Sequence, residues 1–359
     1  MHRRTWLKTS AALAVTTLLG AGCAPLNQSA LSRGDFDALG LKPVPALPPG
    51  GMIGVIAPAG PAVDRVDQGT AWLAERGYRS RVFPACRVPA PVDAPYLAGD
   101  DATRLSDLHA AFADPEVDAI LCLRGGYGSM RLLQHIDFDL LRAHPKPFVG
   151  YSDITALHLA INRYAGWVSF HGPMLTSDLA AGKQEPTASA LFAMLEGRAG
   201  RGMALTQPAD YPLTTLHGGS AAGRLTGGNL SMICATLDTP YEIETRDTIL
   251  FIEDVSEAPY RIDRMLTQLH LAGKLKEVRG VLLGEFTDIG ADSGEQLDEA
   301  ILLPLLKERL APLGIPLLSG WRSGHGDPNL TLPMGAWVSL DADARQLRLE
   351  QDVVLPRRA

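Results

Sequence analysis

The chain has 359 residues, of which 46% are hydrophobic and 20% are charged, and its formal net charge is −7. This composition is typical of a soluble globular protein, and the length suits two domains that can each bury a core. The acidic balance, without a basic stripe interleaved with aromatic residues, argues against nucleic acid as the main partner.

The amino terminus, residues 1–23, is predicted to be an export signal and is set aside from the fold. Arg3 and Arg4 begin a twin-arginine pattern, and the apolar run 11–20 after them is too short for a stable membrane anchor. Cys23 directly follows small residues, as at a lipoprotein cleavage site, where it would carry a lipid anchor. Plain cleavage to a soluble product is the alternative. In both cases we expect an exported, periplasmic protein.

The segment 24–49 is rich in Pro, Ser, Ala and Leu and lacks periodicity, which predicts a tether. The cysteines beyond it, Cys86, Cys122 and Cys234, show no C-x-x-C spacing. Because twin-arginine substrates are exported folded, we expect no disulfide framework. Cys122 lies in an apolar stretch and is predicted to be a small core residue.

The segment 50–198 is predicted to form an N-terminal α/β domain. Short apolar strands alternate with helices, which predicts an open parallel sheet that binds ligands at the carboxyl ends of its strands. The expected strands lie within 51–60, at 79–83 and 119–123, and around Phe148 before Ser152. The expected helices cover 63–76, 100–113, 130–141 and 156–164.

A stretch rich in Gly, Pro and Thr, residues 199–221, is predicted to be the linker to a second domain. Residues 222–359 are predicted to form a mixed α/β domain with more antiparallel character. The expected strands are 248–253, 280–285, 316–320, 336–340 and 346–349. One helix is expected to end at residue 237, and two more are expected over 259–272 and 296–310.

A glycine-rich loop, residues 124–128, comes after one of the predicted strands and precedes a helix. Glycines let the backbone approach a ligand closely, and successive N–H groups can form an anion site. The spacing fits neither the Walker loop nor the dinucleotide fingerprint. A tight strand-to-helix turn is the alternative. Arg124 could hold a substrate carboxylate or pair with a neighbouring acid.

Ser152 lies where a short buried strand turns abruptly into a helix. That is the geometry of a nucleophile elbow, in which the next backbone N–H can stabilise an oxyanion. A serine before an apolar helix is also a common N-cap, and Ser152 alone does not decide between the two interpretations.

Two residues far along the chain could complete a catalytic group with Ser152. Glu253 ends an apolar strand, and His325 lies between glycines in a loop, which makes it a better base than His158 or His270 in helices. A carboxylate can orient the imidazole, which in turn deprotonates the hydroxyl. The alternative is an ordinary solvated acid. No H-E-x-x-H motif or Cys/His ligand group is present, so no metal and no cofactor are expected.

The order of the chain's motifs resembles the LD-carboxypeptidases, murein tetrapeptide carboxypeptidases that include the microcin C self-immunity proteins. The resemblance covers the chain from about residue 51 to its carboxyl end. The motifs are RGGYG from Arg124, GYSD from Gly150, HGPM from His171, GGNL from Gly227, FIED from Phe251 with YRIDRM from Tyr260, and GH from Gly324.

The resemblance implies a class I glutamine amidotransferase-like domain joined to a swivelling C-terminal domain, usually in a homodimer. It implies a triad of Ser152 as nucleophile, His325 as general base and Glu253 as the orienting acid. It also implies release of the terminal D-alanine from murein tetrapeptides without a metal. The backbone N–H groups of Asp153 and Gly126 would form the oxyanion hole. The expected substrate-binding residues are Arg124, Gly125 and Tyr127.

Export departs from the pattern of the family, whose typical members recycle murein in the cytoplasm. Three interpretations therefore stay open. The chain could be an LD-carboxypeptidase acting on wall-attached or released peptides, or an exported serine hydrolase of another amide, such as a microcin C-like peptidyl-nucleotide. It could also be a non-catalytic periplasmic binding protein on a two-domain scaffold.

Overall fold

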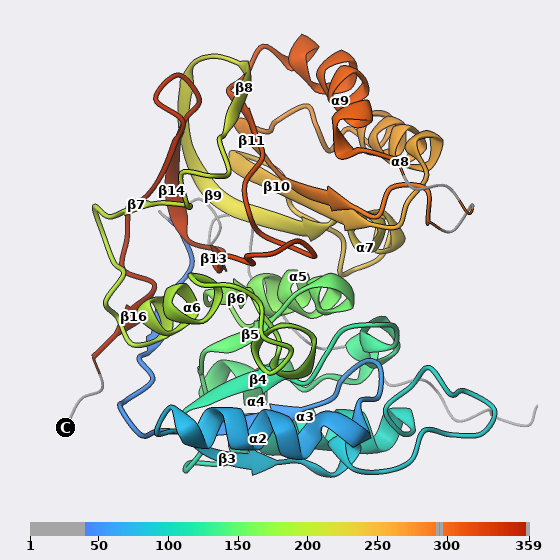
Figure 1. The fold of residues 1–359 in the computed structure, drawn as a ribbon, viewed down its shortest axis with the longest axis vertical. Helices are drawn as coiled ribbons and strands as arrows, with labels where there is room; N and C mark the ends of the chain where they lie inside the picture. Colours follow the sequence, from blue (N-terminus) through green and yellow to red (C-terminus); the bar gives the residue numbers. More distant parts are fainter. Residues whose placement is uncertain (1–39, 292–293, 295–296, 357–359) are drawn as a thin grey trace, which may run out of the picture.

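The computed structural model describes residues 40–291, 294 and 297–356. The predicted export signal, Cys23 and most of the predicted tether lie outside these residues. In the part of the chain that the structure describes, no helix has the length and apolar character needed to cross a membrane. The predicted fold class is confirmed: the chain forms an N-terminal α/β domain and a mixed α/β C-terminal domain, stacked one above the other in Figure 1.

The N-terminal domain is built on a six-stranded sheet with the strand order β13-β6-β5-β4-β2-β3. Its first five strands in the sequence run parallel, as predicted, and β13 (Leu332–Met334) adds antiparallel to β6 from the far end of the chain. The parallel strands are β2 (Met52–Ile56), β3 (Arg79–Val82), β4 (Ala119–Cys122), β5 (Phe148–Gly150) and β6 (Ser169–His171).

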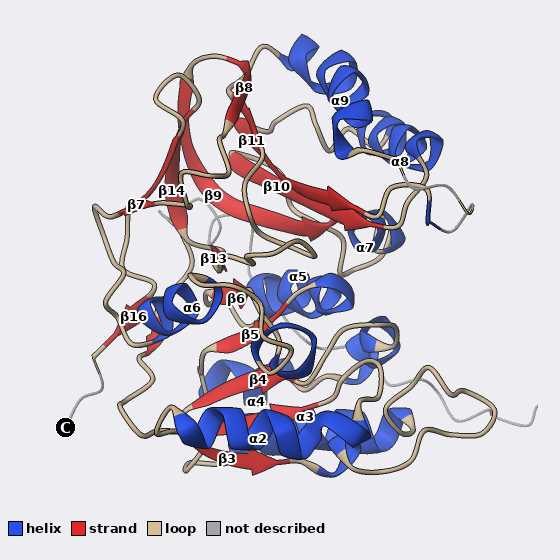
Figure 2. Cartoon of the chain, viewed as in Figure 1, coloured by secondary structure: helices blue, strands red, loops and turns tan. Residues whose placement is uncertain are grey.

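Helices cover both faces of this sheet (Figure 2). They are α2 (Val66–Glu75), α3 (Asp101–Ala113), α4 (Phe138–Ala143), α5 (Thr155–Tyr164) and α6 (Thr187–Leu195). The predicted helix 130–141 is instead a 3₁₀ segment, η3 (Ser129–His135), followed by α4. The break occurs because Asp137 caps a new helix, its carboxylate accepting a hydrogen bond from the Leu140 N–H at 2.9 Å.

The C-terminal domain contains an eight-stranded sheet with the order β7-β15-β14-β9-β10-β11-β12-β8. Its centre is parallel and its edges are antiparallel. Helices α7, α8 and α9 pack on one face (Figures 1 and 2). The bounds are β9 (Ser220–Asn229), α7 (Leu230–Ala235), β10 (Thr248–Val255), α8 (Pro259–Leu271), β11 (Gly280–Thr287), α9 (Leu303–Leu310), β12 (Leu317–Ser319), β14 (Trp337–Asp341) and β15 (Gln346–Leu349).

The predicted linker 199–221 is not a free connection. It contains β7 (Ala204–Leu205) and β8 (Thr214–His217), and β9 begins at its end. β7 pairs with β15 and β8 with β12, so the segment supplies both edges of the C-terminal sheet. The composition misled the prediction because two- and four-residue edge strands carry no apolar alternation.

The end of the predicted tether also belongs to the fold. β1 (Val44–Pro45) pairs in parallel with β16 (Val354–Leu355), and Leu47 is buried with its N–H donating to the Leu195 carbonyl at 2.8 Å. Residues 40–49 therefore strap the two ends of the described chain together on the N-terminal domain. The segment was predicted to be a tether because it is rich in proline and because β1, at two residues, is too short to show a periodic pattern.

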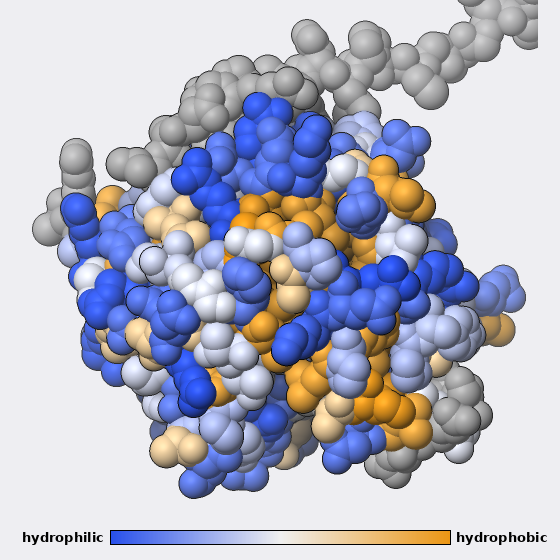
Figure 3. Space-filling view, turned by 90° about the horizontal axis from the view of Figure 1, so that it is seen from above, coloured by the Kyte–Doolittle hydropathy of each residue, from blue (hydrophilic) through white to orange (hydrophobic). Residues whose placement is uncertain are grey.

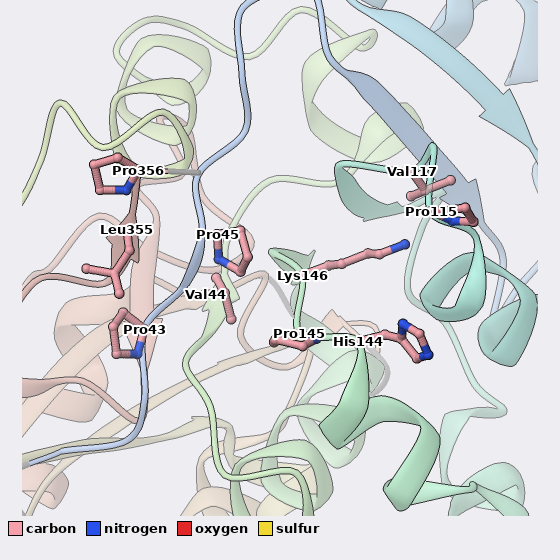
Figure 4. Close-up of a pocket in the computed structure, with 10 residues that line it drawn as sticks. All are labelled: Pro43, Val44, Pro45, Pro115, Val117, His144, Pro145, Lys146, Leu355 and Pro356. Carbon is pink, nitrogen blue, oxygen red and sulfur yellow. The ribbon is translucent and has the colours of Figure 1, made fainter. Parts of the chain in front are cut away.

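An apolar cavity of about 520 Å³ adjoins this strap (Figure 4). Its lining includes Pro45 of the strap, Val117, which precedes β4, and Lys146, which precedes β5. It therefore lies at the amino ends of the strands, opposite the edge that carries Ser152.

Figure 3, seen from the end of the molecule that carries α9 and β8, shows apolar side chains gathered between polar ones on that surface.

Substituting Leu47→Ala should lower the free energy of unfolding by about 2–5 kcal/mol, because a buried side chain leaves a cavity in the core. Chemical denaturation monitored by circular dichroism measures the change. The control is Val92→Ala, a substitution at a side chain that is 94% exposed, and it should leave stability nearly unchanged. Equal stability of Leu47→Ala and the unsubstituted chain would show that residues 40–49 behave as a tether after all.

Candidate functional site

Ser152 lies at the sharp turn between β5 and the helical segment that continues into α5. Its φ is +62°, in the left-handed region that a residue with a side chain enters at a cost of about 1–3 kcal/mol. The N-cap positions of the two helical segments are Tyr151 and Ile154, and neither makes a side-chain capping bond. Ser152 is thus not an N-cap, and its strained turn has the form of a nucleophile elbow.

The structure brings Ser152, His325 and Glu253 together. His325 Nε2 lies 3.1 Å from Ser152 Oγ, and His325 Nδ1 lies 2.7 Å from Glu253 Oε2. Glu253 is fully buried, whereas the His325 side chain is 17% exposed. Because the carboxylate can only accept, Nδ1 donates to Glu253 and Nε2 is left to accept the serine proton.

The electrostatic setting of His325 favours its protonated form. Burial by itself lowers the pKa of this imidazole, but the charge of Glu253 and its hydrogen bond, with the charge of Asp254, outweigh burial and raise the pKa above its ordinary value of 6.5. The raised pKa makes this imidazole a stronger base for accepting a proton from a hydroxyl.

The glycine-rich loop lies directly against Ser152. A Cβ on Gly125 would lie 3.0 Å from Ser152 Cβ and 3.3 Å from its Oγ, so any side chain there would force Ser152 or the loop to shift. The Gly125 carbonyl accepts a hydrogen bond from the Gly60 N–H at 3.0 Å. In a trans peptide the N–H points away from the carbonyl, so the Gly126 N–H is directed away from Gly60.

Asp153 fixes the elbow to the same loop. Its Oδ2 accepts a hydrogen bond from the Ser129 N–H at 2.8 Å, and its backbone carbonyl accepts one from Ser129 Oγ at 2.5 Å. Burial raises the pKa of the Asp153 carboxyl, although its bonds to Ser129 oppose the shift. The backbone N–H of Asp153 is a predicted oxyanion donor, and its side chain holds the turn in place through Ser129.

Arg104, which the sequence analysis did not single out, supports the loop from below. This residue of α3 is 1% exposed, and its guanidinium donates to the carbonyls of Pro58 and Gly128, the latter at 2.9 Å. It joins the loops that come after β2 and β4. An arginine among the apolar residues of a predicted helix was the only signal, and α3 also buries Asp107.

Arg124 and Tyr127 lie on the exposed rim. Arg124 lines a polar cavity of about 340 Å³ together with Arg65, Thr176 and Ser177. Asp64 lines the same cavity, but Arg124 forms no ion pair among the described residues. The hydrogen bond of its guanidinium is to the Pro61 carbonyl, at 3.4 Å. Tyr127 is 47% exposed and packs its ring edgewise on Tyr96.

Behind Glu253, a buried polar cluster holds the ends of β9 and β10. Asp254 accepts hydrogen bonds from Asn229 Nδ2 at 2.9 Å and Ser231 Oγ at 2.7 Å. Asn229 also donates its backbone N–H to Thr155 Oγ1, at the start of α5, at 3.0 Å. Burial and the charge of Glu253 raise the pKa of Asp254 to about 6. In the sequence, Asn229 is marked only by its place in the GGNL motif, which gives no sign of this role.

No cluster of three or more His, Cys, Asp or Glu side chains suited to a metal ion occurs in the described ranges of the chain. The site is instead a hydroxyl, an imidazole and a carboxylate in hydrogen-bond contact, beside backbone amides at the start of a helix. Such an arrangement can carry out nucleophilic attack on a carbonyl with general acid–base assistance.

Two family models match the chain. Residues 53–172 match the LD-carboxypeptidase N-terminal domain, and residues 222–340 match the LD-carboxypeptidase C-terminal domain. Over 317 residues the chain is 40% identical to a probable murein peptide carboxypeptidase of Bacillus subtilis (strain 168), which covers 88% of this chain and 96% of that protein. It is 34% identical over 258 residues to a murein tetrapeptide carboxypeptidase of Pseudomonas aeruginosa, covering 69% and 80% of the two chains.

Solved structures share the architecture. A muramoyltetrapeptide carboxypeptidase from Oxalobacter formigenes superposes with a TM-score of 0.68 at 32% identity, over 83% of this chain and 97% of that one. MccF in complex with glutamyl sulfamoyl guanosine superposes with a TM-score of 0.78 over 87% and 99% of the two chains; its 24% identity shows likeness of fold alone. With the matching domain models and relatives, these findings show that the chain belongs to the LD-carboxypeptidase family.

Proposed function

We propose that this protein is a serine carboxypeptidase that cleaves the amide bond between the diamino acid and the terminal D-alanine of murein tetrapeptides. The observation that carries the proposal is the pair of contacts made by His325, 3.1 Å to Ser152 Oγ and 2.7 Å to Glu253 Oε2. Family membership and the names of the relatives agree with this substrate class.

The geometry gives each residue of the triad a step. Ser152 Oγ attacks the carbonyl carbon of the diamino acid while His325 Nε2 takes its proton, and Glu253 stabilises the imidazolium that results. His325 then protonates the nitrogen of the departing D-alanine, which leaves an ester on Ser152. Water, deprotonated by His325, hydrolyses this ester and restores the serine. None of these steps calls for a metal ion.

Two backbone amides are suited to stabilise the tetrahedral oxyanion. Asp153 comes directly after the nucleophile at the start of a helical segment, where N–H groups are free of intrahelical partners. The Gly126 N–H is directed away from Gly60, and its neighbour Gly125 touches Ser152. Loss of one such donor typically costs about 100–1,000-fold in rate.

The polar cavity at Arg124 is suited to the free carboxylate that an exopeptidase must recognise. Its residues come after β2, β4 and β6, and Ser152 comes after β5, which lies between β4 and β6 in the sheet. The cavity and the nucleophile therefore share one edge. Two guanidiniums and two hydroxyls can bind a carboxylate through charge-assisted hydrogen bonds. Gly125 and Tyr127 would border the bound peptide.

The fold of MccF keeps a second substrate class open, because that protein has been solved with aminoacyl sulfamoyl nucleosides. Side-by-side turnover of a murein tetrapeptide and a peptidyl-nucleotide distinguishes the two. Release of D-alanine from the tetrapeptide supports the main proposal, and turnover of the nucleotide alone supports the second. Turnover of neither would favour a non-catalytic binding protein.

The cellular setting is part of the proposal. The twin-arginine pattern supports export, and Cys23 supports a lipid anchor that would hold the enzyme beside the wall. The family resemblance supports a homodimer. Exposed apolar side chains of the C-terminal domain, such as Leu271 at 79% exposure, offer surface for such contact. Fractionation, palmitate labelling with Cys23→Ser as control, and ultracentrifugation test these points.

Replacing the nucleophile, Ser152→Ala, should reduce kcat/KM for D-alanine release by about 10⁴-fold or more. The fold should persist because the change removes only one oxygen. A coupled D-alanine assay measures the rate, and Ser189→Ala, in the exposed part of α6, is the control that should keep full activity. Undiminished hydrolysis by Ser152→Ala would refute the serine mechanism.

The pH dependence of the reaction should track the protonation of His325. Only the neutral imidazole can accept the serine proton, so kcat/KM should rise with pH through a midpoint above 6.5. Glu253→Gln removes the main charge that raises this pKa, so the midpoint should move to lower pH while the rate falls by about 10⁴-fold. A pH–rate profile measures both changes, and exposed Glu277→Gln should change neither. A midpoint that stays in place would exclude Glu253 as the partner of the base.

Arg124→Ala should weaken substrates that end in a free carboxylate. Loss of a charge-assisted hydrogen bond of about 1.5–3 kcal/mol corresponds to a fall in kcat/KM of roughly 10–150-fold. A tetrapeptide whose carboxyl end is amidated should be a poor substrate and lose little more. Arg87→Ala, an exposed arginine that pairs with Asp67, is the matched control. An equal fall for both substrates would mean that Arg124 does not read the carboxylate.

A further inference from the structure

A largely buried lysine of the N-terminal domain, Lys183, contacts the loop that carries His325. We define the His325 loop as residues 323–329, between β12 and β13. Lys183 Nζ donates hydrogen bonds to the backbone carbonyls of His325, at 3.1 Å, and Gly326, at 2.7 Å. Its side chain is only 14% exposed, so these contacts are made largely out of water.

Lys183 is itself held by a buried carboxylate. Asp178 Oδ1, fully buried, lies 2.6 Å from Lys183 Nζ. The same carboxylate accepts hydrogen bonds from the Tyr151 hydroxyl at 3.2 Å and the Met174 N–H at 2.9 Å, and it contacts Asn329 Nδ2 at 3.3 Å. Tyr151 precedes the nucleophile, so the anchor of Lys183 is tied to the elbow.

Residues next to Lys183 reinforce the grip. The Gln184 N–H donates to Asp327 Oδ1 at 2.8 Å, and Thr187 Oγ1 accepts from the Asn329 N–H at 2.9 Å. From its own domain the His325 loop is held by Arg322, which pairs with Glu285 and donates to the Asp327 carbonyl. The His325 loop is thus clasped from both domains.

We propose that Lys183 is a positioning residue that aligns His325 with Ser152 across the domain interface. Glu253 and His325 belong to the C-terminal domain, whereas Lys183 and Ser152 belong to the N-terminal domain. Loss of Lys183 therefore loosens the contact of His325 with Ser152 but leaves its contact with Glu253. The inference rests on the proposed serine mechanism but not on the identity of the peptide.

The charge of Lys183 gives the proposal a second consequence. Among the groups around His325, Glu253 and Asp254 raise the pKa of the imidazole and Lys183 lowers it. Removing the ammonium should raise that pKa, whereas a loop that drifted away from Glu253 would have a lowered one. The titratable and charged groups facing His325 and its loop are Glu253, Asp254, Lys183, Asp178, Tyr151, His171, Glu285 and Arg322.

The test compares Lys183→Met with Lys183→Arg in the full chain. In Lys183→Met we expect kcat to fall by roughly 10–100-fold, because a misplaced base slows the chemical step. KM should stay nearly unchanged, because the substitution leaves substrate binding intact. The midpoint of the acid limb should move to higher pH. Lys183→Arg should keep the midpoint of the unsubstituted enzyme and recover part of kcat. Lys276→Met, at an exposed lysine of the C-terminal domain, controls for net charge.

Two measurements keep the test independent of folding defects and of the substrate. Asp178→Asn with Lys183→Met removes both charges and avoids a buried unpaired carboxylate. Labelling by a fluorophosphonate, in which Ser152 Oγ bonds to phosphorus, fluoride leaves and His325 takes the proton, should slow by the same factor as kcat. NMR titration of the His325 ring reads its pKa directly.

The outcomes separate the two proposals. An enzyme that is labelled at Ser152 but releases no D-alanine refutes the murein substrate, and the labelling rates and the titration still test Lys183. Unchanged labelling rate and unchanged His325 pKa in Lys183→Met would overturn the positioning role. A lowered pKa would overturn it as well, because it would mean that Lys183 holds His325 against Glu253 and not against Ser152.

Discussion

The hydrogen bond from His325 to Ser152 joins the two domains of this chain at the candidate active site. Ser152 follows a strand of the N-terminal sheet, whereas Glu253 and His325 belong to the C-terminal domain, so the complete triad exists only while the domains keep this arrangement. Several features hold it. β13 extends the N-terminal sheet from the far end of the chain, Asn229 bonds to Thr155 at the start of α5, and Lys183 grips the His325 loop.

The buried charges around His325 oppose one another. Glu253 is fully buried, and an isolated buried carboxylate would cost several kcal/mol, so it requires a donor such as the imidazole. The same attraction stabilises the imidazolium that forms when His325 accepts the serine proton. Asp254 adds to this attraction, and Lys183 offsets part of it. The basicity of His325 is therefore set by groups from both domains, and the domain arrangement bears on the strength of the base as well as on its position.

Local sequence patterns predicted what local forces determine. The buried strands β2, β4, β5, β10 and β11 showed apolar runs, and Ser152 was placed correctly just after a strand. Glu253 was predicted to end its strand, but β10 continues past it to Val255. Contacts between residues distant in the chain gave no such pattern. Lys183 and Arg104 look like ordinary polar residues because their partners, backbone carbonyls of other loops, leave no mark in the sequence. The strap at β1 and the edge strand β7 are two residues long, too short for any periodicity.

The elbow and the glycine-rich loop depend on each other. Ser152 keeps its strained φ because the residues on its C-terminal side are fixed, Asp153 by Ser129 and Thr155 by Asn229. The loop can approach Ser152 only because Gly125 has no side chain, and a methyl group there would push the nucleophile or the loop away. The nucleophile and the backbone amides beside it are therefore held in fixed positions by their neighbours. The exposed side chains of the rim, Arg124 above all, make few contacts with the rest of the protein, so discrimination among substrates should reside there and not in the triad.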